Sequence, residues 1–196
     1  VNELAKKHKL IVIEDAAQSI DSYYKDKSLG SIGDLGTFSF HETKNIQCGE
    51  GGLLAINNTK YRSRSEVLWE KGTNRAEFFR GEVNKYGWVD TGSSFLPSEI
   101  TSAYLLAQLE SIEKIQTLRK TIWNQYQTEL LQLEIEGKIK LPFIPDYATN
   151  NAHMFYIILD SIETRSRLIK YLKENGIYAV FHYLALHKSP FYKKKY

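Results

Sequence analysis

The sequence is poor in cysteine and has no long apolar run. A single cysteine among 196 residues excludes an intramolecular disulfide and any zinc site built from several cysteines. This sparing use is typical of a reducing compartment, and we expect a cytoplasmic protein. No stretch approaches the roughly 18 apolar residues that a membrane-spanning helix needs, so we expect no membrane partner.

The sequence also lacks a large excess of charge of either sign. The formal net charge is +3, and the run Lys193 to Lys195 accounts for all of it, because without these three lysines the basic and acidic residues are equal in number. Such a balance gives no support for the basic footprint of a nucleic-acid-binding protein, and we expect no nucleic-acid partner. Val1 is neither an initiating methionine nor the start of a signal-peptide pattern, and we expect the chain to be part of a longer protein.

The first half of the chain carries the pattern of an α/β sheet. A helical segment over residues 1–8 leads into the apolar run 10–13, which is typical of a buried parallel strand. Two further strands are predicted over 36–41 and 51–57. Ligands of open α/β sheets gather beyond the carboxyl ends of the strands, so Asp15 and Gln18, which follow the first strand, are well placed to bind one.

The second half is predicted to be mainly helical, with a small domain at its end. Apolar residues recur at helical spacing over 97–135, longer than one ordinary helix, which predicts two helices or one bent helix. Residues 72–95 lack periodicity but are rich in aromatic residues, which predicts an ordered loop lining a site or a subunit contact. Beyond them, a strand over 153–159, a helix over 164–175 and a strand over 177–183 form a β-α-β unit. The predicted domains are 1–96, 97–136 and 137–196.

The segment SFHETKN, residues 39–45, carries the strongest chemical signal. It ends a short β-prone run and is followed by the glycines of residues 49–52, which let the backbone turn sharply. Lys44 in this segment is therefore held against a ligand rather than in solvent, and it is our candidate for a covalent, carbonyl-binding amine. Asp15 stands at the end of a neighbouring predicted strand, and the two residues equally suit a simple ion pair.

Pyridoxal phosphate requires these two residue types together. It needs a lysine for its Schiff base and an acid beside its pyridine nitrogen, so that the ring can accept electrons. Ser39 is a candidate for the cofactor phosphate, although a strand serine often serves packing alone. Gln18 is a candidate contact of the ring, although it also suits the start of a helix.

Several motifs resemble one family of enzymes over nearly the whole chain. The segments IVIEDAAQS (11–19), GTFSFHETKN (36–45) and GEGG (49–52) resemble the sugar-nucleotide aminotransferases of the DegT/DnrJ/EryC1 group. Three longer runs resemble, within that group, the transaminases that make dTDP-4-amino-4,6-dideoxygalactose. These runs cover residues 69–100, 151–157 and 179–187.

The resemblance implies a fragment of the fold type I architecture of aminotransferases dependent on pyridoxal phosphate. The chain would hold the back part of the large-domain sheet and most of a small α+β C-terminal domain. Active sites would be shared within a homodimer. Lys44 would be the Schiff-base lysine, Asp15 the partner of the pyridine nitrogen, Gln18 a ring contact and Ser39 a phosphate contact. His41 lies in the same motif, where a packing role is expected.

The reaction implied is amino transfer from glutamate to dTDP-4-dehydro-6-deoxy-glucose, giving a 4-amino sugar for surface polysaccharide. Ser94 stands where many relatives carry an asparagine that reaches the neighbouring subunit's phosphate. The candidates for binding substrate phosphates or carboxylate are Arg75, Arg80, His182, Tyr183 and His187.

Two alternatives remain open at this point. A related sugar dehydratase would replace the lysine with histidine, whereas Lys44 is present. A non-catalytic nucleotide-sugar-binding or regulatory paralogue would need neither Lys44 nor Asp15, and both are intact. The 196-residue segment alone is predicted to be inactive, because the family's earlier half supplies part of the cofactor pocket.

Overall fold

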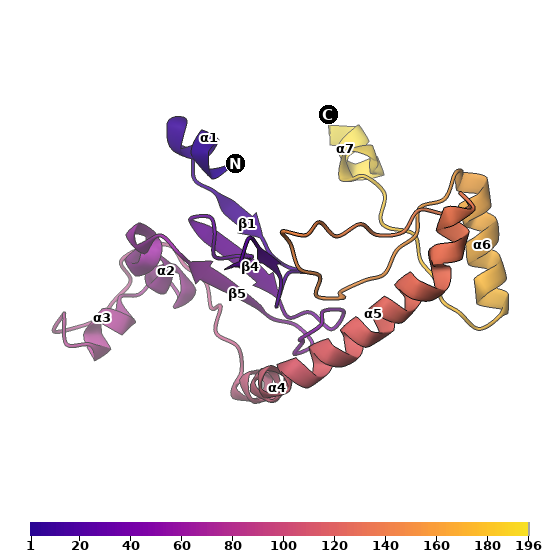
Figure 1. Ribbon diagram of the computed structural model, residues 1–196. Coiled ribbons are helices and arrows are strands. Elements are labelled where there is room, and N and C mark those ends of the chain that lie inside the picture. The colour runs from indigo at the N-terminus through magenta and orange to yellow at the C-terminus, as the bar shows by residue number, and fades with distance from the viewer. Residues whose placement is uncertain (196) are drawn as a thin grey trace. The chain divides into compact units, whose positions relative to one another are not determined.

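A computed structural model describes residues 1–195, in which a small sheet is followed by two long helices (Figure 1). The strands are β1 (Ile13–Asp15), β2 (Tyr23–Tyr24), β3 (Lys27–Ser28), β4 (Leu35–Ser39) and β5 (Gly52–Ile56). The helices are α1 (Asn2–Lys7), α2 (Arg62–Trp69), α3 (Arg75–Phe79), α4 (Glu99–Glu110), α5 (Ile112–Ile135), α6 (Ile162–Glu174) and α7 (Pro190–Lys195). Short 3-10 turns form η1 (Thr59–Tyr61) and η2 (Leu186–Lys188).

The three strands predicted in the first half form one sheet, in the order β1-β4-β5. β1 is parallel to β4, with Asp15 opposite Thr37, and β5 is antiparallel to β4, with Gly52 opposite Ser39. The prediction of a buried strand over 10–13 is wrong in detail, because β1 begins at Ile13 and this residue is 61% exposed. Within residues 1–195, β1 is an edge strand paired with β4 alone, so its side chains are only partly covered.

The carboxylate of Glu14 organises the loop that leads from β3 into β4. Its two oxygens accept backbone N–H groups of Gly30, Ile32 and Gly33 at 2.9, 2.6 and 2.6 Å. The loop thereby passes so close to β4 that a Cβ on Gly36 would lie 2.0 Å from the carbonyl oxygen of Gly30. The charge of Glu14 thus fixes the loop against the strand that carries the candidate site.

We expect Glu14→Gln to lower the thermal stability of the protein. A glutamine has one acceptor oxygen and presents an NH₂ group to the N–H groups of the loop, so at least one charge-assisted hydrogen bond is lost, at a cost of about 2 kcal/mol. The melting temperature reports this change, and Glu3→Gln on α1 is the matched control because Glu3 is exposed. An unchanged melting temperature in Glu14→Gln would show that the loop does not depend on the charge.

Lys44 lies in the loop that joins β4 to β5. The antiparallel pairing continues beyond the strands, since the N–H of Phe40 donates to the carbonyl oxygen of Gly51 at 2.8 Å and that of Glu42 to Gly49 at 2.8 Å. Gly49 has φ +80°, a left-handed conformation that suits glycine. The predicted sharp turn behind Lys44 is confirmed.

The helical pattern over 97–135 forms two helices, as predicted. Ser98 caps α4, its hydroxyl accepting the N–H of Thr101 at 3.2 Å, and Ser111 separates α4 from α5. The predicted loop 72–95 is ordered and contains the short helix α3, and Phe78 on this helix packs against Tyr86 with ring centroids 5.5 Å apart.

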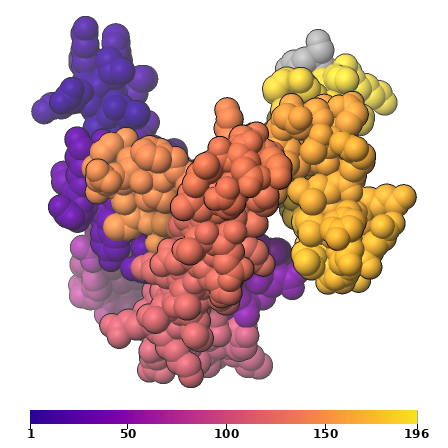
Figure 2. All heavy atoms as spheres, turned by 45° about the vertical axis from the view of Figure 1, so that its right-hand side comes forward, coloured from indigo at the N-terminus to yellow at the C-terminus, as the bar shows by residue number. Residues whose placement is uncertain are grey.

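The chain divides into two compact units, one formed by residues 1–128 with 143–155 and the other by 129–142 with 156–196. The domain boundaries given above, at 97 and 137, stay a prediction about the complete protein. In the first unit the segment 143–155 lies against the N-terminal part of the chain (Figure 2). The N–H of Thr149 donates to the carbonyl oxygen of Tyr23 in the β2–β3 hairpin at 3.0 Å.

The second unit holds α6, which confirms the helix predicted over 164–175. Ser161 caps it by accepting the N–H of Thr164 at 3.1 Å. The strands predicted over 153–159 and 177–183 are absent from the described residues except for a single bridge, in which Lys140 and Ile158 exchange two backbone hydrogen bonds of 2.9 Å. Their β-prone residues lack a longer partner segment here, and β-propensity alone does not form a strand.

Candidate active site

Three of the four candidate cofactor residues line one small pocket. Gln18 comes from the turn after β1, Ser39 from the end of β4, and Lys44 from the loop beyond it. The remaining lining residues are Ala16, Ala17, Ile20, Phe38, Asn45 and His153. Residues that carry an amine, a hydroxyl and an amide therefore line one pocket at the carboxyl ends of two neighbouring parallel strands, where ligands of α/β sheets bind.

Asp15, the fourth candidate, ends β1 beside this pocket. Its Oδ1 accepts the N–H of Ala17 at 3.2 Å, which orients the carboxylate, and the rest of the side chain is exposed. The register places Asp15 opposite Thr37, two residues before Ser39 on β4. No ion pair joins Asp15 to Lys44 in the described part of the chain, so the carboxylate and the amine remain separately available.

A network of buried amides holds Asn45, which lines the pocket. Asn45 Nδ2 donates to Gln116 Oε1 at 2.9 Å and to the carbonyl oxygen of Asn151 at 2.7 Å. Gln116 Nε2 donates to Asp21 Oδ2 at 3.1 Å, and Asn151 Nδ2 donates to the carbonyl oxygens of Gln18 and Ile20, both at 2.8 Å. The network ties the Lys44 loop, the turn after β1 and helix α5 together.

Helix α5 also holds the backbone that leads to His153. Arg119 donates from Nε to the carbonyl oxygen of Ala152 at 3.2 Å and from Nη2 to that of His153 at 2.8 Å. Ala152 is buried with φ +53°, a strained conformation for a residue with a Cβ. Strain of this kind persists only where neighbouring contacts enforce it.

Electrostatics favour the neutral form of His153. Burial, together with the positive charges of Lys44 and Arg119, holds the pKa of His153 below its ordinary value of 6.5. Burial likewise lowers the pKa of Arg119, which remains far above neutral pH as an arginine.

Removing the central amide of this network is expected to destabilise the protein. Gln116 is 3% exposed, and Gln116→Leu removes the acceptor of one Asn45 N–H and one of the two donors to the Asn151 carbonyl. One buried N–H of Asn45 is then left unsatisfied, at a cost of roughly 1–3 kcal/mol. Thermal or urea unfolding measures the loss. Asn124→Leu, on an exposed position of the same helix, is the control, and equal stabilities of the two variants would contradict the role of the network.

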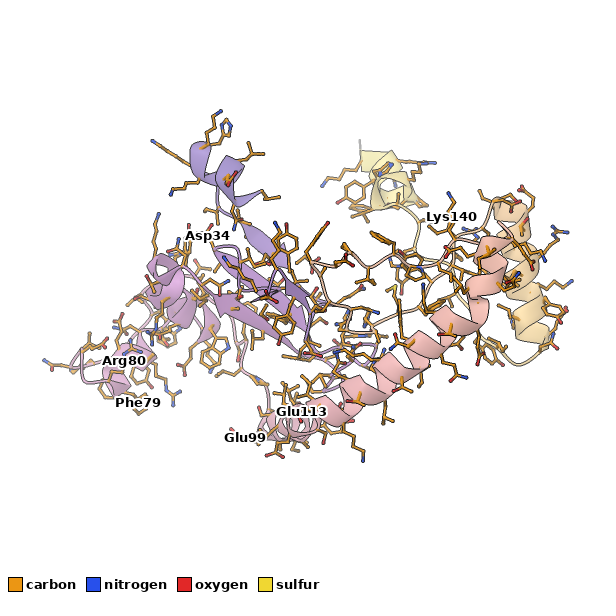
Figure 3. All side chains as sticks on the ribbon, viewed as in Figure 1. Asp34, Phe79, Arg80, Glu99, Glu113 and Lys140 are labelled. Atoms are coloured by element: carbon orange, nitrogen blue, oxygen red, sulfur yellow. The ribbon has the colours of Figure 1, made fainter. Side chains whose placement is uncertain are left out.

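The two candidate arginines for substrate binding do not line the Lys44 pocket. Arg75 on α3 pairs with the buried carboxylate of Glu70 and lies over the ring of Phe79, 4.8 Å from its centroid. Arg80 lies at the end of α3 (Figure 3). It pairs with Glu66 at 3.0 Å and with Glu82 at 2.7 Å. These two carboxylates raise the pKa of Arg80, and Arg80 in turn lowers that of Glu82.

The other three substrate candidates belong to the second unit. His182 and Tyr183 are adjacent exposed rings with centroids 5.8 Å apart, and His187 lies in η2, also exposed. Ser94, in the first unit, forms an isolated antiparallel β-bridge with Glu70. The roles of all six residues stay predictions.

Sequence reasoning missed Asn45 and His153, which line the pocket, and Gln116 and Asn151, which hold the Asn45 side chain. Asn45 follows Lys44 directly, and an amide next to a candidate catalytic lysine is a signal that the sequence does contain. The partners of Asn45 could not be predicted from the sequence, because Gln116 and Asn151 lie 71 and 106 residues away from it along the chain.

Two kinds of feature are absent from residues 1–195. These residues contain no group of three or more histidine, cysteine, aspartate or glutamate residues arranged to hold a metal ion. No helix in the same range combines the length and apolar character needed to cross a membrane.

The profile of the DegT/DnrJ/EryC1/StrS aminotransferase family matches residues 1–196. The chain belongs to this family. Among its relatives, the spore coat polysaccharide biosynthesis protein SpsC of Bacillus subtilis is 32% identical over 200 residues, which cover 98% of this chain and 51% of SpsC.

Solved structures share the fold. S. venezuelae DesV superimposes with a TM-score of 0.83 at 26% identity, covering 99% of this chain and 49% of DesV. Helicobacter pylori PseC, an aminotransferase involved in the biosynthesis of pseudaminic acid, gives 0.82 at 25% identity, covering 99% of this chain and 51% of PseC. The α/β aminotransferase fold is therefore confirmed, and the chain spans about half the length of the relatives that it matches.

Proposed function

We propose that the complete protein is an aminotransferase that uses pyridoxal phosphate to move an amino group from glutamate to a 4-keto-6-deoxy nucleotide sugar, dTDP-4-dehydro-6-deoxy-glucose. The observation that carries the proposal is the meeting of Gln18, Ser39 and Lys44 in one pocket, beside the strand that ends in Asp15. The family of the chain and the polysaccharide role in the name of SpsC support the same chemistry.

The donor set fits the cofactor. Lys44 offers the amine, Asp15 the acid for the pyridine nitrogen, Ser39 a hydroxyl for the phosphate and Gln18 an amide for the ring. When bound, pyridoxal phosphate supplies an electron sink for the carbanion that forms when the substrate loses a proton. This chain would supply the Lys44 amine and the Asp15 carboxylate that act on the cofactor.

Each residue then has one task. The Lys44 amine would hold the cofactor covalently and, once free, would move a proton to and from the reacting carbon of the substrate. The Asp15 carboxylate keeps the pyridine nitrogen protonated, and its hydrogen bond from Ala17 fixes the orientation. The Ser39 hydroxyl and the Gln18 amide orient the cofactor, so that the reacting atoms stay aligned.

The remaining parts of the proposal concern the complete protein. Arg75, Arg80, His182, Tyr183 and His187 are proposed to bind the nucleotide sugar or the carboxylate of glutamate. Their use would require that Arg75 and Arg80 exchange their present carboxylate partners for substrate groups. A homodimer with shared active sites completes the proposal, with Ser94 near the phosphate of the neighbouring subunit.

The test is an assay of amino transfer by a polypeptide of the relatives' full length. It is supplied with glutamate and a panel of 4-keto and 3-keto nucleotide sugars, and the formation of 2-oxoglutarate is followed. We expect turnover with a 4-keto-6-deoxy sugar. Binding of pyridoxal phosphate without 2-oxoglutarate from any sugar would contradict the proposed substrate class and favour a non-catalytic paralogue.

A further inference from the structure

The directions of the hydrogen bonds in the buried amide network are fixed by backbone carbonyl groups. A carbonyl oxygen only accepts, so the Asn45 atom 2.7 Å from the carbonyl of Asn151 must be the NH₂ nitrogen. Gln116 Nε2 likewise faces that carbonyl, at 3.3 Å, and the carboxylate of Asp21. The orientation of each side-chain amide is therefore determined, because the carbonyl of Asn151 and the carboxylate of Asp21 can only accept hydrogen bonds.

This assignment determines which nitrogen of His153 carries a proton. With its nitrogen turned to Asn151, Asn45 presents Oδ1 to the imidazole, and His153 Nδ1 lies 2.9 Å from that oxygen. Because an amide oxygen cannot donate, Nδ1 must carry the hydrogen. The neutral imidazole is thus the Nδ1–H tautomer, and its Nε2 has a free lone pair.

The same residue lines the pocket that holds Lys44. Nδ1 is engaged by Asn45, so Nε2 is the ring nitrogen that remains for a pocket group. Asn151 Oδ1 accepts the N–H of His153 at 3.1 Å, and Arg119 binds its carbonyl oxygen, so the backbone at this position is held on both sides.

We propose that His153 is a positioning residue for Lys44, its unprotonated Nε2 accepting a hydrogen bond from the Lys44 amine. The proposal rests on the proposed role of Lys44 as the carbonyl-binding amine. One N–H of the amine would then be bound to His153, and the rest of the nitrogen would face the pocket. A carbonyl group that enters the pocket would therefore approach the nitrogen in one fixed orientation.

The charges around the ring support this arrangement. Among the described residues, the charged groups that act on His153 are Lys44, from the β4–β5 loop, and Arg119, from α5. Both are cations and disfavour the imidazolium, which could not accept a hydrogen bond. The carboxylate of Asp21 reaches the network only through Gln116 and is paired with Lys120 at 2.9 Å.

Nitrogen-15 NMR of the complete protein, labelled at histidine, tests the tautomer without any assay of activity. The signal of His153 is identified by its absence in His153→Gln. We expect a protonated Nδ1 and an unprotonated Nε2 near neutral pH, with the imidazolium appearing only below the ordinary pKa of 6.5. A protonated Nε2 at neutral pH would overturn the proposal.

The rate at which the complete protein combines with pyridoxal phosphate tests the positioning itself. We expect His153→Phe to slow the appearance of the cofactor's visible absorbance by about tenfold, or about 1.4 kcal/mol, because the acceptor for the Lys44 amine is lost together with the Nδ1–H donation to Asn45 Oδ1. His153→Gln offers an acceptor oxygen and is expected to recover most of the rate. His8→Phe, on an exposed residue that follows α1, is the control and keeps the rate of the unaltered protein.

The outcomes separate this inference from the proposed function. If the unaltered protein gains no visible absorbance, both fail, because Lys44 then binds no carbonyl. If it does and His153→Phe reacts at the same rate, or both His153 variants react equally slowly, only the positioning role fails. A folding defect is recognised by a lowered melting temperature in both variants, and the tautomer seen by NMR in the unaltered protein then decides the proposal.

Discussion

Lys44→Ala is expected to lose amino transfer almost completely. The variant lacks the only pocket-lining amine among the described residues, and removing a positioned acid-base group costs about 10²–10⁴-fold in rate, before the loss of covalent attachment is counted. The measurement is the formation of 2-oxoglutarate from glutamate by the complete protein with a saturating keto sugar. The variant should also lack the cofactor's visible absorbance.

The control for this variant is Lys27→Ala. Lys27 is an exposed lysine on β3, within the same unit, and its removal changes the net charge by the same amount. We expect it to keep both turnover and colour. A Lys44→Ala protein that turns over at the rate of the control would remove the basis of the proposed chemistry.

Asp15→Asn is expected to give the second largest effect, a loss of about 10²–10³-fold in turnover, which is the range for removing one preorganised electrostatic group. Asparagine keeps the oxygen that accepts the N–H of Ala17, so the turn after β1 should stay intact. What changes is the negative charge, which is required to hold a proton on the pyridine nitrogen. Turnover and melting temperature are measured together.

Asp26→Asn serves as the control for this charge. Asp26 has φ +61° in the β2–β3 turn, a conformation that asparagine adopts readily, and it is exposed. We expect Asp26→Asn to change neither the turnover nor the melting temperature. Should Asp15→Asn keep full turnover, the acid beside the ring nitrogen must come from elsewhere in the protein.

The sequence was sufficient to predict local structure where a single periodicity dominates. The helical spacing of apolar residues over 97–135 gave α4 and α5, and the β-prone run before Lys44 gave β4. The location of Asp15 and Lys44 near adjacent strand ends also followed, because parallel strands bring their carboxyl ends to one edge of the sheet.

Features that depend on distant partners could not be predicted in this way. The apolar segments 153–159 and 177–183 have strand-like composition, yet whether they form strands depends on a pairing partner that their own residues do not specify. The bond between Asn45 and His153 joins residues 108 positions apart. A pattern read along the chain contains no information about such a pair.

The loop 72–95 illustrates a middle case. Its aromatic content correctly indicated an ordered segment, and Phe78, Phe79 and Tyr86 do pack together. The ion pairs of Arg75 and Arg80 with nearby glutamates were not foreseen, because several carboxylates lie within reach of each arginine in the sequence. Charge alone therefore did not distinguish a substrate contact from a structural pair.

The most direct measurement is the position of the covalent bond to the cofactor. The complete protein, incubated with pyridoxal phosphate and reduced with borohydride, is digested and its peptides are mapped by mass spectrometry. The account predicts that the reduced cofactor is attached to Lys44. Attachment to another lysine, with the Lys44 peptide unmodified, would contradict it.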